Sequence, residues 1–247
     1  MAETKTTKQT KPKTTTKPKA SAAKKTDKPK EPKLEAVKKA VPKIDARIFA
    51  VKERKEWVET NQKALGIDDD HIIWDEKHEG ATATARKAWG LKTESPYIMV
   101  LNDDVELCDD FMKYCEVMVD THPDSIISLF PFQFRKRKMV RNRARRSPYI
   151  TTKNAIGMGI IMKKEYVEPC LASWKSDLSD DVNITNWAHD ESITILTTLP
   201  STIQHIGDDS VIDSDRKVGR TDFFKKNLSD IAWDNDFINS WSNVVSH

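Results

Sequence analysis

The chain has 247 residues, with 41 basic and 38 acidic side chains, and 38% of its residues are hydrophobic. This length and composition predict one folded domain of ordinary size with enough apolar residues for a core. No run of about 18 apolar residues occurs, which excludes a membrane-spanning helix of the usual kind. Three cysteines without metal-site spacing fit a reducing compartment, so we expect the protein to act in the cytoplasm.

The charge is divided unevenly along the chain. Residues 1–43 contain 14 Lys against 4 acidic residues, a net charge of +10, which leaves about −7 of the total +3 for the rest. This first segment has no aromatic residue and no apolar signal region, and it cannot bury enough surface to fold. We therefore predict a disordered basic tail at 1–43, a folded domain at 44–220, and an extension at 221–247 that packs on the domain through Trp233 and Trp241.

The first half of the folded part alternates predicted strands and helices. Apolar runs predict strands at 46–51, 71–74, 97–101 and 125–130, and charged amphipathic runs predict helices at about 53–65, 80–89 and 109–119. Gly66 and Gly90 are expected to end the first two helices. This alternation with short connections indicates an α/β fold with a mostly parallel, Rossmann-like sheet flanked by helices.

After residue 146 the pattern becomes mixed. Residues 154–162 predict a strand with Gly157 and Gly159 on one face, and glycine in a strand often marks the close approach of a ligand or of another backbone. A helix carrying His189-Asp190-Glu191 is predicted within 183–196, and residues 200–207 predict a short strand or turn.

Three oxygen-bearing side chains, Asn102, Asp103 and Asp104, follow the predicted strand at 97–101. Buried charges are costly without a partner, and Mg²⁺ and Mn²⁺ favour carboxylate oxygens. Ligands of open parallel sheets bind beyond the carboxyl ends of the strands, where Asp75 also lies. We therefore expect these four residues to face one site that could hold a metal-bound diphosphate. The alternative is an ordinary strand end capped by Asx turns.

Six segments together resemble a known family. IIWDEKHEG, ARKAW, YIMVLNDDVEL, IGMGIIM, HDES and PSTIQHIGDDS are similar, in their order and spacing, to nucleotide-sugar-dependent glycosyltransferases of the GT-A fold. The resemblance covers about residues 45–215. It implies transfer of a sugar from a nucleoside-diphosphate donor, with a UDP-sugar favoured, to a hydroxyl group, with Mn²⁺ or Mg²⁺ as the cofactor.

The resemblance assigns roles on the donor side. Asp75 matches an acid that contacts the base or ribose, and Arg86 matches a basic residue that approaches the nucleotide or its phosphates. The metal-binding DxD motif of the family reads Asn102-Asp103-Asp104 here, so an amide replaces its first carboxylate. Asp104 is then the principal expected metal ligand, and Asp103 is expected to contact the ribose or the sugar. The alternative makes Asp75 and Arg86 ordinary surface residues.

Two later segments complete the expected site. His205 resembles a histidine that reaches the metal or the diphosphate, and imidazole suits Mn²⁺ beside a carboxylate. With Asn102 and Asp104 it forms the expected metal-binding set. Asp190 stands where inverting members carry the base that deprotonates the acceptor, and Glu191 is the second candidate for that role. The alternative for this pair is a helix N-terminal turn, where acids are favoured by the helix dipole.

A basic segment points to the acceptor. It has 8 basic residues and no acid, and without it the folded part would carry about −15. Its basic residues are Arg135, Lys136, Arg137, Lys138, Arg141, Arg143, Arg145 and Arg146. Arginine pairs bidentately with phosphate, and the Lys-rich tail would add salt-dependent affinity for nucleic acid.

These charges favour DNA as the acceptor. Bacteriophage DNA glycosyltransferases, which decorate hydroxymethylated bases, are the precedent. The host cytoplasm would then be the place of action, and a target base would have to be flipped from the stack. The sequence leaves alternatives open. One is a glycan, a protein or an anionic lipid as the partner of the basic segment. Another is a non-catalytic nucleic-acid-binding protein on a transferase scaffold.

Overall fold

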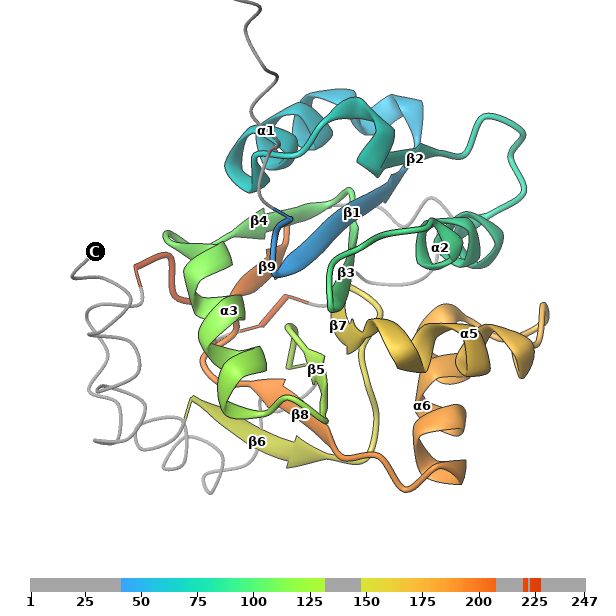
Figure 1. Ribbon diagram of the computed structural model, residues 1–247. Helices are drawn as coiled ribbons and strands as arrows, with labels where there is room; N and C mark the ends of the chain where they lie inside the picture. The colour runs from blue at the N-terminus through green and yellow to red at the C-terminus, as the bar shows by residue number, and fades with distance from the viewer. Residues whose placement is uncertain (1–40, 132–147, 208–219, 222, 228–247) are drawn as a thin grey trace, which may run out of the picture. The chain divides into compact units, whose positions relative to one another are not determined.

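The computed structural model describes residues 41–131, 148–207, 220–221 and 223–227 (Figure 1). Its strands are β1 (Ile44–Ala50), β2 (Ile72–Trp74), β3 (Tyr97–Asn102), β4 (Val105–Leu107), β5 (Ile126–Ser128), β6 (Tyr149–Thr152), β7 (Gly159–Lys163), β8 (Ile195–Thr198) and β9 (Ile203–His205). Its helices are η1 (Lys52–Arg54), α1 (Lys55–Leu65), η2 (Asp69–His71), α2 (Ala81–Gly90), α3 (Phe111–Thr121), α5 (Lys164–Ala172) and α6 (Asp180–Asp190). None of the described helices is long and apolar enough to cross a membrane.

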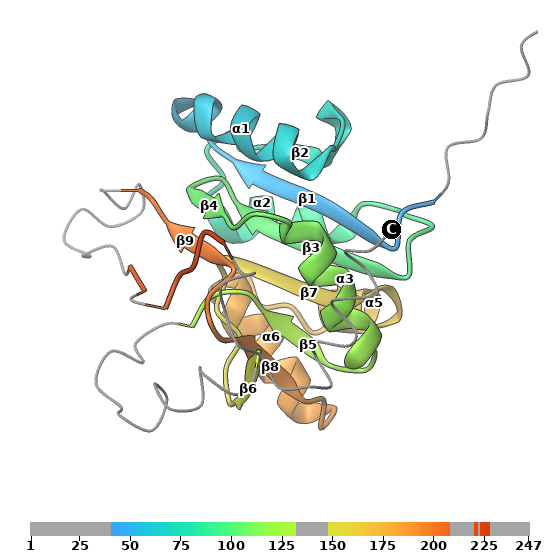
Figure 2. The same ribbon diagram turned by 90° about the vertical axis from the view of Figure 1, so that its left-hand side faces the viewer.

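The central sheet has seven strands in the order β2-β1-β3-β7-β5-β8-β6, and β4 and β9 form a separate two-stranded sheet. β1 is parallel to β2 and β3, and β5 is parallel to β8, whereas β7 and β6 are antiparallel to their neighbours. Five of the seven strands therefore run in one direction, which confirms the predicted α/β class with a mostly parallel sheet. The arrows of β1 and β7 point in opposite directions in Figure 2.

Helices cover both faces of the sheet (Figure 1). Along β3, Tyr97, Met99 and Leu101 belong to one core cluster with residues of α1 and α3. The intervening Ile98 and Val100 belong to a second cluster with residues of α2, α5 and α6. Successive strand side chains point to opposite faces, so a continuous apolar run is what a sheet buried on both faces requires.

The predicted end of the first helix agrees with the structure, whereas the end of the second helix and the start of the strand predicted at 154–162 differ from it. Gly66 ends α1 in the left-handed conformation, with φ at +65°, as expected of a helix-ending glycine. Gly90 is the last residue of α2 and not the residue after it. The strand predicted at 154–162 is shorter, because β7 begins only at Gly159, so Gly157 does not lie on a strand face.

Gly159 nevertheless marks a close approach. A Cβ atom at Gly159 would lie 2.7 Å from Cδ2 of Leu101 and 3.0 Å from Cδ1 of Ile203. In the pairing of β7 with β3, Gly159 lies directly opposite Leu101 itself. Only a residue without a side chain therefore allows β7 to pair with β3 while Leu101 and Ile203 fill the core beside it.

Three features of the sequence lie outside the described residues. They are residues 1–40 of the predicted tail, the basic segment 135–146, and Trp233 and Trp241 of the predicted extension.

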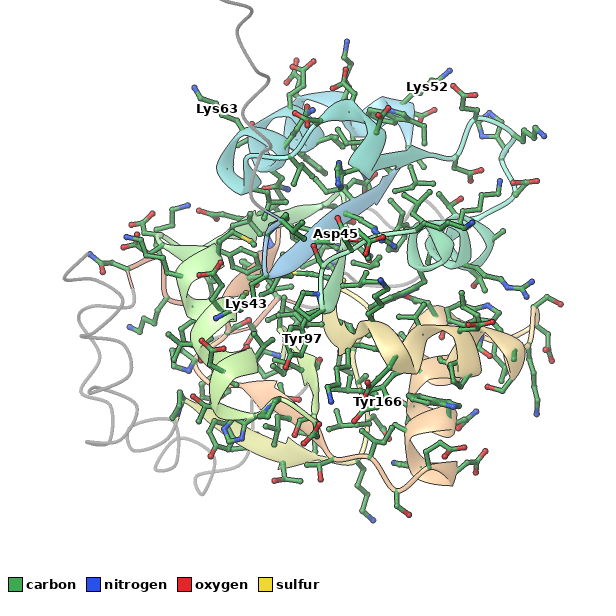
Figure 3. The ribbon with its side chains drawn as sticks, in the orientation of Figure 1. Lys43, Asp45, Lys52, Lys63, Tyr97 and Tyr166 are labelled. Atoms are coloured by element: carbon green, nitrogen blue, oxygen red, sulfur yellow. The ribbon has the colours of Figure 1, made fainter. Side chains whose placement is uncertain are left out.

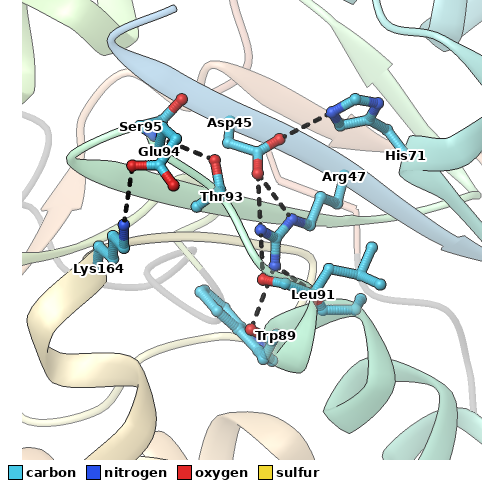
Figure 4. A network of polar contacts seen from close by, with 10 residues as sticks. Asp45, Arg47, His71, Trp89, Leu91, Thr93, Glu94, Ser95 and Lys164 are labelled. Carbon is cyan, nitrogen blue, oxygen red and sulfur yellow. Dashed lines mark hydrogen bonds and ion pairs between the residues drawn. The ribbon is translucent and has the colours of Figure 1, made fainter. Parts of the chain in front are cut away.

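A buried ionic network fastens α2 to β1 (Figure 4). Arg47, which is fully buried, donates from Nη2 to Oδ2 of Asp45 at 2.6 Å and from Nε to the same oxygen at 3.1 Å. The other carboxylate oxygen of Asp45 lies 3.1 Å from Nε2 of His71. Arg47 also donates to the carbonyl oxygens of Trp89 at 3.2 Å and Leu91 at 2.9 Å, at the C-terminus of α2. A cation at this end complements the helix dipole.

Arg47→Met should lower the free energy of unfolding by about 3–5 kcal/mol, because it leaves Asp45 buried without its counter-ion. The measurement is urea denaturation followed by circular dichroism. The matched control is Lys55→Met, which breaks an exposed pair with Glu59 at 3.5 Å and should cost less than about 1 kcal/mol. Equal losses in the two variants would show that the buried network does not hold α2.

Candidate functional site

The carboxyl ends of β1, β2 and β3 share one edge of the sheet, called the carboxyl edge below. After β3, the chain turns through Asp103 and Asp104 into β4, which pairs with β9 so that Val105 lies opposite His205. The backbone N–H of Ile206 donates to the carbonyl oxygen of Asp104 at 2.9 Å. Two segments far apart in the sequence are thereby brought side by side at this edge.

Asp104 is the centre of the polar contacts at the carboxyl edge. Its Oδ2 forms an ion pair with Nη1 of Arg54 at 2.7 Å and lies 2.9 Å from Nε2 of His205. Its Oδ1 is buried and has no hydrogen-bond partner within the described part of the chain. The same is true of Oδ1 of Asn102. Buried acceptors of this kind are costly, so two of them at one strand end point to a bound group.

Gly207 keeps the space beside Asp104 open. A Cβ atom at Gly207 would lie 3.1 Å from Oδ2 of Asp104 and 3.3 Å from Nε2 of His205. Both distances are shorter than ordinary van der Waals contacts to carbon. Any larger residue would therefore press on the oxygen and the nitrogen that face each other here.

Asp103 is held inside the fold. Its Oδ2 accepts from the backbone N–H of Val51 at 2.8 Å, and its Oδ1 accepts from Nη1 of Arg54 at 2.8 Å. Burial raises the pKa of Asp103, while the N–H of Val51 and the guanidinium of Arg54 oppose that rise. These bonds tie the end of β1 to the end of β3. Both oxygens of Asp103 thus have partners in the fold, and its contact with a donor stays a prediction.

Arg54 is a site residue that the sequence reasoning missed. It lies in η1, just beyond the carboxyl end of β1, and its guanidinium carbon is 5.8 Å from the centre of the Trp57 ring. The available signal was its position, since residues that follow a parallel strand lie at the ligand-binding edge of the sheet.

Asp75 lies at the carboxyl edge, as expected, because it directly follows β2 and its N–H donates to the carbonyl oxygen of Ala50 at 2.8 Å. Its two carboxylate oxygens accept from the backbone N–H groups of Glu79 at 2.8 Å and Gly80 at 2.9 Å. They shape the loop before α2. Arg86 is exposed on α2, where Nη2 lies 3.5 Å from the carbonyl oxygen of Leu171 on α5. A donor contact by either residue stays a prediction.

Asp190 and Glu191 are not brought to the carboxyl edge. They lie at the C-terminal end of α6, so the alternative of a helix N-terminal turn is wrong. After α6 the chain enters β8, and the N-terminal end of β8 pairs with the C-terminal end of β6. His189 marks the same place, since its Nε2 is 2.6 Å from the carbonyl oxygen of Lys153. Because β8 is parallel to β5, this end of the sheet is opposite to Asp104.

The N-terminal end of α6 does reach the carboxyl edge, through Asp180. Oδ1 of Asp180 would lie only 2.9 Å from a Cβ atom at Gly157. Met158, the residue after Gly157, accepts the backbone N–H of Asn102 with its carbonyl oxygen at 3.2 Å. The Sδ atom of Met158 lies 3.8 Å from Nδ2 of Asn102. Residues 157–158 therefore connect the end of α6 with the end of β3.

Burial, together with the charge of Asp181, raises the pKa of Asp180 to about 7. The sequence reasoning missed this pair of acids, although Ser179 followed by Asp180 and Asp181 is a typical helix start. The start of α6 at Asp180, before the predicted range of 183–196, explains the miss.

The residues at the carboxyl edge fit a divalent cation that takes its remaining ligands from water or phosphate. No group of three His, Cys, Asp or Glu residues suited to a metal occurs within the described ranges. Asp104 and His205 supply two such ligands, and the amide oxygen of Asn102 is a further acceptor. Neighbouring ligands of an octahedral ion are about 3 Å apart, and the distance from Oδ2 of Asp104 to Nε2 of His205 is 2.9 Å. Mg²⁺ commonly uses few protein ligands and takes the rest from water and phosphate.

Comparison with known proteins gives a distant structural likeness only. No protein-family model and no curated protein matches the sequence. The catalytic domain of Drosophila β1,4-galactosyltransferase 7 in complex with xylobiose is similar over 74% of this chain and 77% of that chain, with 10% identity and a TM-score of 0.45. A mutant of the Drosophila enzyme in complex with manganese, UDP-Gal and xylobiose is similar over 70% and 76%, with 11% identity and a TM-score of 0.41.

Proposed function

We propose that the protein is a metal-dependent glycosyltransferase of the GT-A type, which moves a sugar from a nucleoside-diphosphate donor to a hydroxyl group. A UDP-sugar is the favoured donor. The observation that carries this proposal is the facing pair of Asp104 and His205 at the carboxyl edge. Beside it lie buried oxygens of Asp104 and Asn102 that have no hydrogen-bond partner among the described residues. Mn²⁺ or Mg²⁺ held by Asp104, His205 and Asn102 would neutralise the charge of the diphosphate leaving group.

The chain's own residues fix the geometry of this site. The pairing of β4 with β9 places His205 against Asp104, and Gly207 leaves room for oxygens of the donor. Asp75 and Arg86 remain the proposed contacts of the nucleotide, with Asp75 acting from the end of β2. The carboxylate of Asp103 keeps the ends of β1 and β3 together, and therefore holds Asp104 in place.

We place the catalytic base at Asp180 instead of Asp190 or Glu191. Asp180 adjoins the end of β3 through residues 157–158, whereas Asp190 lies at the opposite edge. Its carboxylate would take the proton of the acceptor hydroxyl while that oxygen bonds to the anomeric carbon. The bond from this carbon to the diphosphate oxygen breaks, and the nucleoside diphosphate leaves with the bonding electrons. A single displacement of this kind inverts the anomeric centre.

Asp104→Ala should abolish Mn²⁺-dependent binding of UDP, because it removes the carboxylate that faces His205. Asp180→Asn should spare that binding and lower turnover by about 10²–10⁴-fold, the usual contribution of a general base. Calorimetric titration with UDP and mass spectrometry of UDP-sugar hydrolysis or transfer measure the two properties.

The matched control is Asp190→Asn, an exposed acid of the same helix, which should leave binding and turnover close to wild type. If turnover were lost in Asp190→Asn but kept in Asp180→Asn, the catalytic base would be Asp190, at the C-terminal end of α6. Absence of UDP binding by the wild-type protein, with Mn²⁺ present, would contradict the proposed function itself.

The rate at saturating substrate should rise with pH and reach half of its maximum near the raised pKa of Asp180, at about 7. Only the ionised carboxylate can accept a proton, so the rate is low below this pH and level above it. A pH profile of initial rates at constant Mn²⁺ checks the expectation. The rise should disappear from the residual activity of Asp180→Asn, and a profile unchanged in that variant would exclude Asp180 as the titrating group.

For the acceptor, we propose DNA that carries a hydroxymethylated base. The support comes from the charge of the sequence alone, in the Lys-rich residues 1–43 and the basic segment 135–146. The described residues near Asp180 add no basic patch, since Asp177 and Asp181 adjoin it. Because the surroundings of Asp180 are acidic, a hydroxyl group of a neutral glycan is the competing acceptor.

The affinity for DNA should fall steeply with added salt. In a plot of log K against log salt concentration, each phosphate contact should contribute about −0.9 to the slope. Changing Arg141, Arg143 and Arg145 to Gln should therefore reduce the slope in filter-binding or fluorescence assays. Lys52→Gln and Lys63→Gln, which alter exposed lysines on η1 and α1 (Figure 3), provide the control and should leave the slope unchanged. Absent or salt-insensitive DNA binding would favour the glycan acceptor.

A further inference from the structure

We propose that Arg54 is a built-in counter-ion of the metal site, which occupies the ligating oxygen of Asp104 until a divalent cation displaces it. The inference rests on the proposed function of the same cluster and adds to it how the site is regulated. It assigns Arg54 a positioning role and no contact with the reacting atoms.

The geometry of one nitrogen atom carries the inference. Nη1 of Arg54 lies 2.8 Å from Oδ1 of Asp103 and 2.7 Å from Oδ2 of Asp104, so it bridges two neighbouring carboxylates. Oδ2 of Asp104 is also the oxygen that faces Nε2 of His205. The guanidinium therefore contacts the very atom that a metal shared with His205 would need.

Burial explains why a counter-ion is needed there. Asp103 is 4% exposed and Asp104 is 5% exposed, and they are adjacent in the chain. Two buried negative charges without a cation nearby would strongly disfavour the folded state. One guanidinium serves both carboxylates, and it is itself largely buried, with 15% of its side chain exposed.

The two carboxylates are anchored differently, which allows an exchange. Asp103 has a second bond, from the N–H of Val51, and can keep Arg54 in place through Oδ1. Asp104 has a second oxygen, Oδ1, that is buried and lacks a hydrogen-bond partner among the described residues. A cation on Oδ2 of Asp104 can thus replace Arg54 there, with Oδ1 available as a further oxygen, while Arg54 remains on Asp103. Because the ion and the guanidinium repel each other, the ion alone binds weakly, and the negative diphosphate of the donor strengthens its binding.

The test is titration with Mn²⁺ in the absence of nucleotide, with free Mn²⁺ measured by electron paramagnetic resonance. Arg54→Gln should bind Mn²⁺ at least about tenfold more tightly than the wild type, because a competing positive charge is gone. The matched control is Lys52→Gln in the same η1 helix, whose Nζ pairs with Glu76 at 3.7 Å and should not matter. Equal Mn²⁺ affinity in Arg54→Gln and wild type would overturn the inference.

Thermal unfolding keeps the inference testable if Arg54→Gln folds poorly. In EDTA the midpoint of Arg54→Gln should lie below that of the wild type, and Mn²⁺ should raise it by more than it raises the wild type. Arg54→Lys preserves the charge and should retain the weak Mn²⁺ binding of the wild type. Tight binding in Arg54→Lys, or no larger stabilisation of Arg54→Gln by Mn²⁺, would contradict a charge competition.

The two claims can fail separately. A wild-type protein that does not bind UDP in the presence of Mn²⁺ contradicts the proposed function. Wild-type and Arg54→Gln proteins that bind Mn²⁺ equally contradict the role of Arg54, whatever UDP does.

Discussion

The bridge from Arg54 to Asp103 and Asp104 is the interaction on which the organisation of the carboxyl edge depends. It allows two adjacent carboxylates to be buried where β1, β3 and β4 meet. Through the N–H of Val51, Asp103 fixes the end of β1, and through His205, Asp104 reaches the β4–β9 sheet. Without a cation at this point the sheet would end in uncompensated charge, which proteins avoid.

A second buried ionic network shows what distinguishes this cluster. Asp45 and Arg47 are equally buried, but each oxygen of Asp45 has a cationic or imidazole nitrogen within 3.1 Å, and Arg47 caps the carbonyl end of α2. Through these contacts, the network ties α2 to β1 and serves the fold. At the carboxyl edge, by contrast, oxygens of Asn102 and Asp104 remain without partners in the described part of the chain.

The sequence predicted those parts of the fold that depend on local pattern. The apolar run before Asn102 identified β3 and its carboxyl end, and Gly66 identified the end of α1. The antiparallel insertion of β7 was not predictable in this way, because strand direction depends on tertiary pairing. The same limit explains the site. A helix near Asp190 was correctly expected, but which end of α6 faces the carboxyl edge follows only from the direction of β8.

Arg54 illustrates the other limit of local pattern. In the sequence it is one charge among many in a helix, and only the packing of η1 beside the end of β3 places it between two carboxylates. His205 had a recognisable context, and its pairing opposite Val105 brings it to Asp104. Local sequence therefore identified the residue types proposed as ligands, while sheet topology decided which of them meet.

The most direct test of the central claim, that the carboxyl edge binds a divalent cation with a diphosphate, is anomalous diffraction from crystals grown with MnCl₂ and UDP. We expect one manganese peak within coordination distance of both Asp104 and His205, next to the diphosphate, with Arg54 retained on Asp103. A manganese peak elsewhere, or Asp104 still bonded to Arg54 with UDP absent from this edge, would contradict the account.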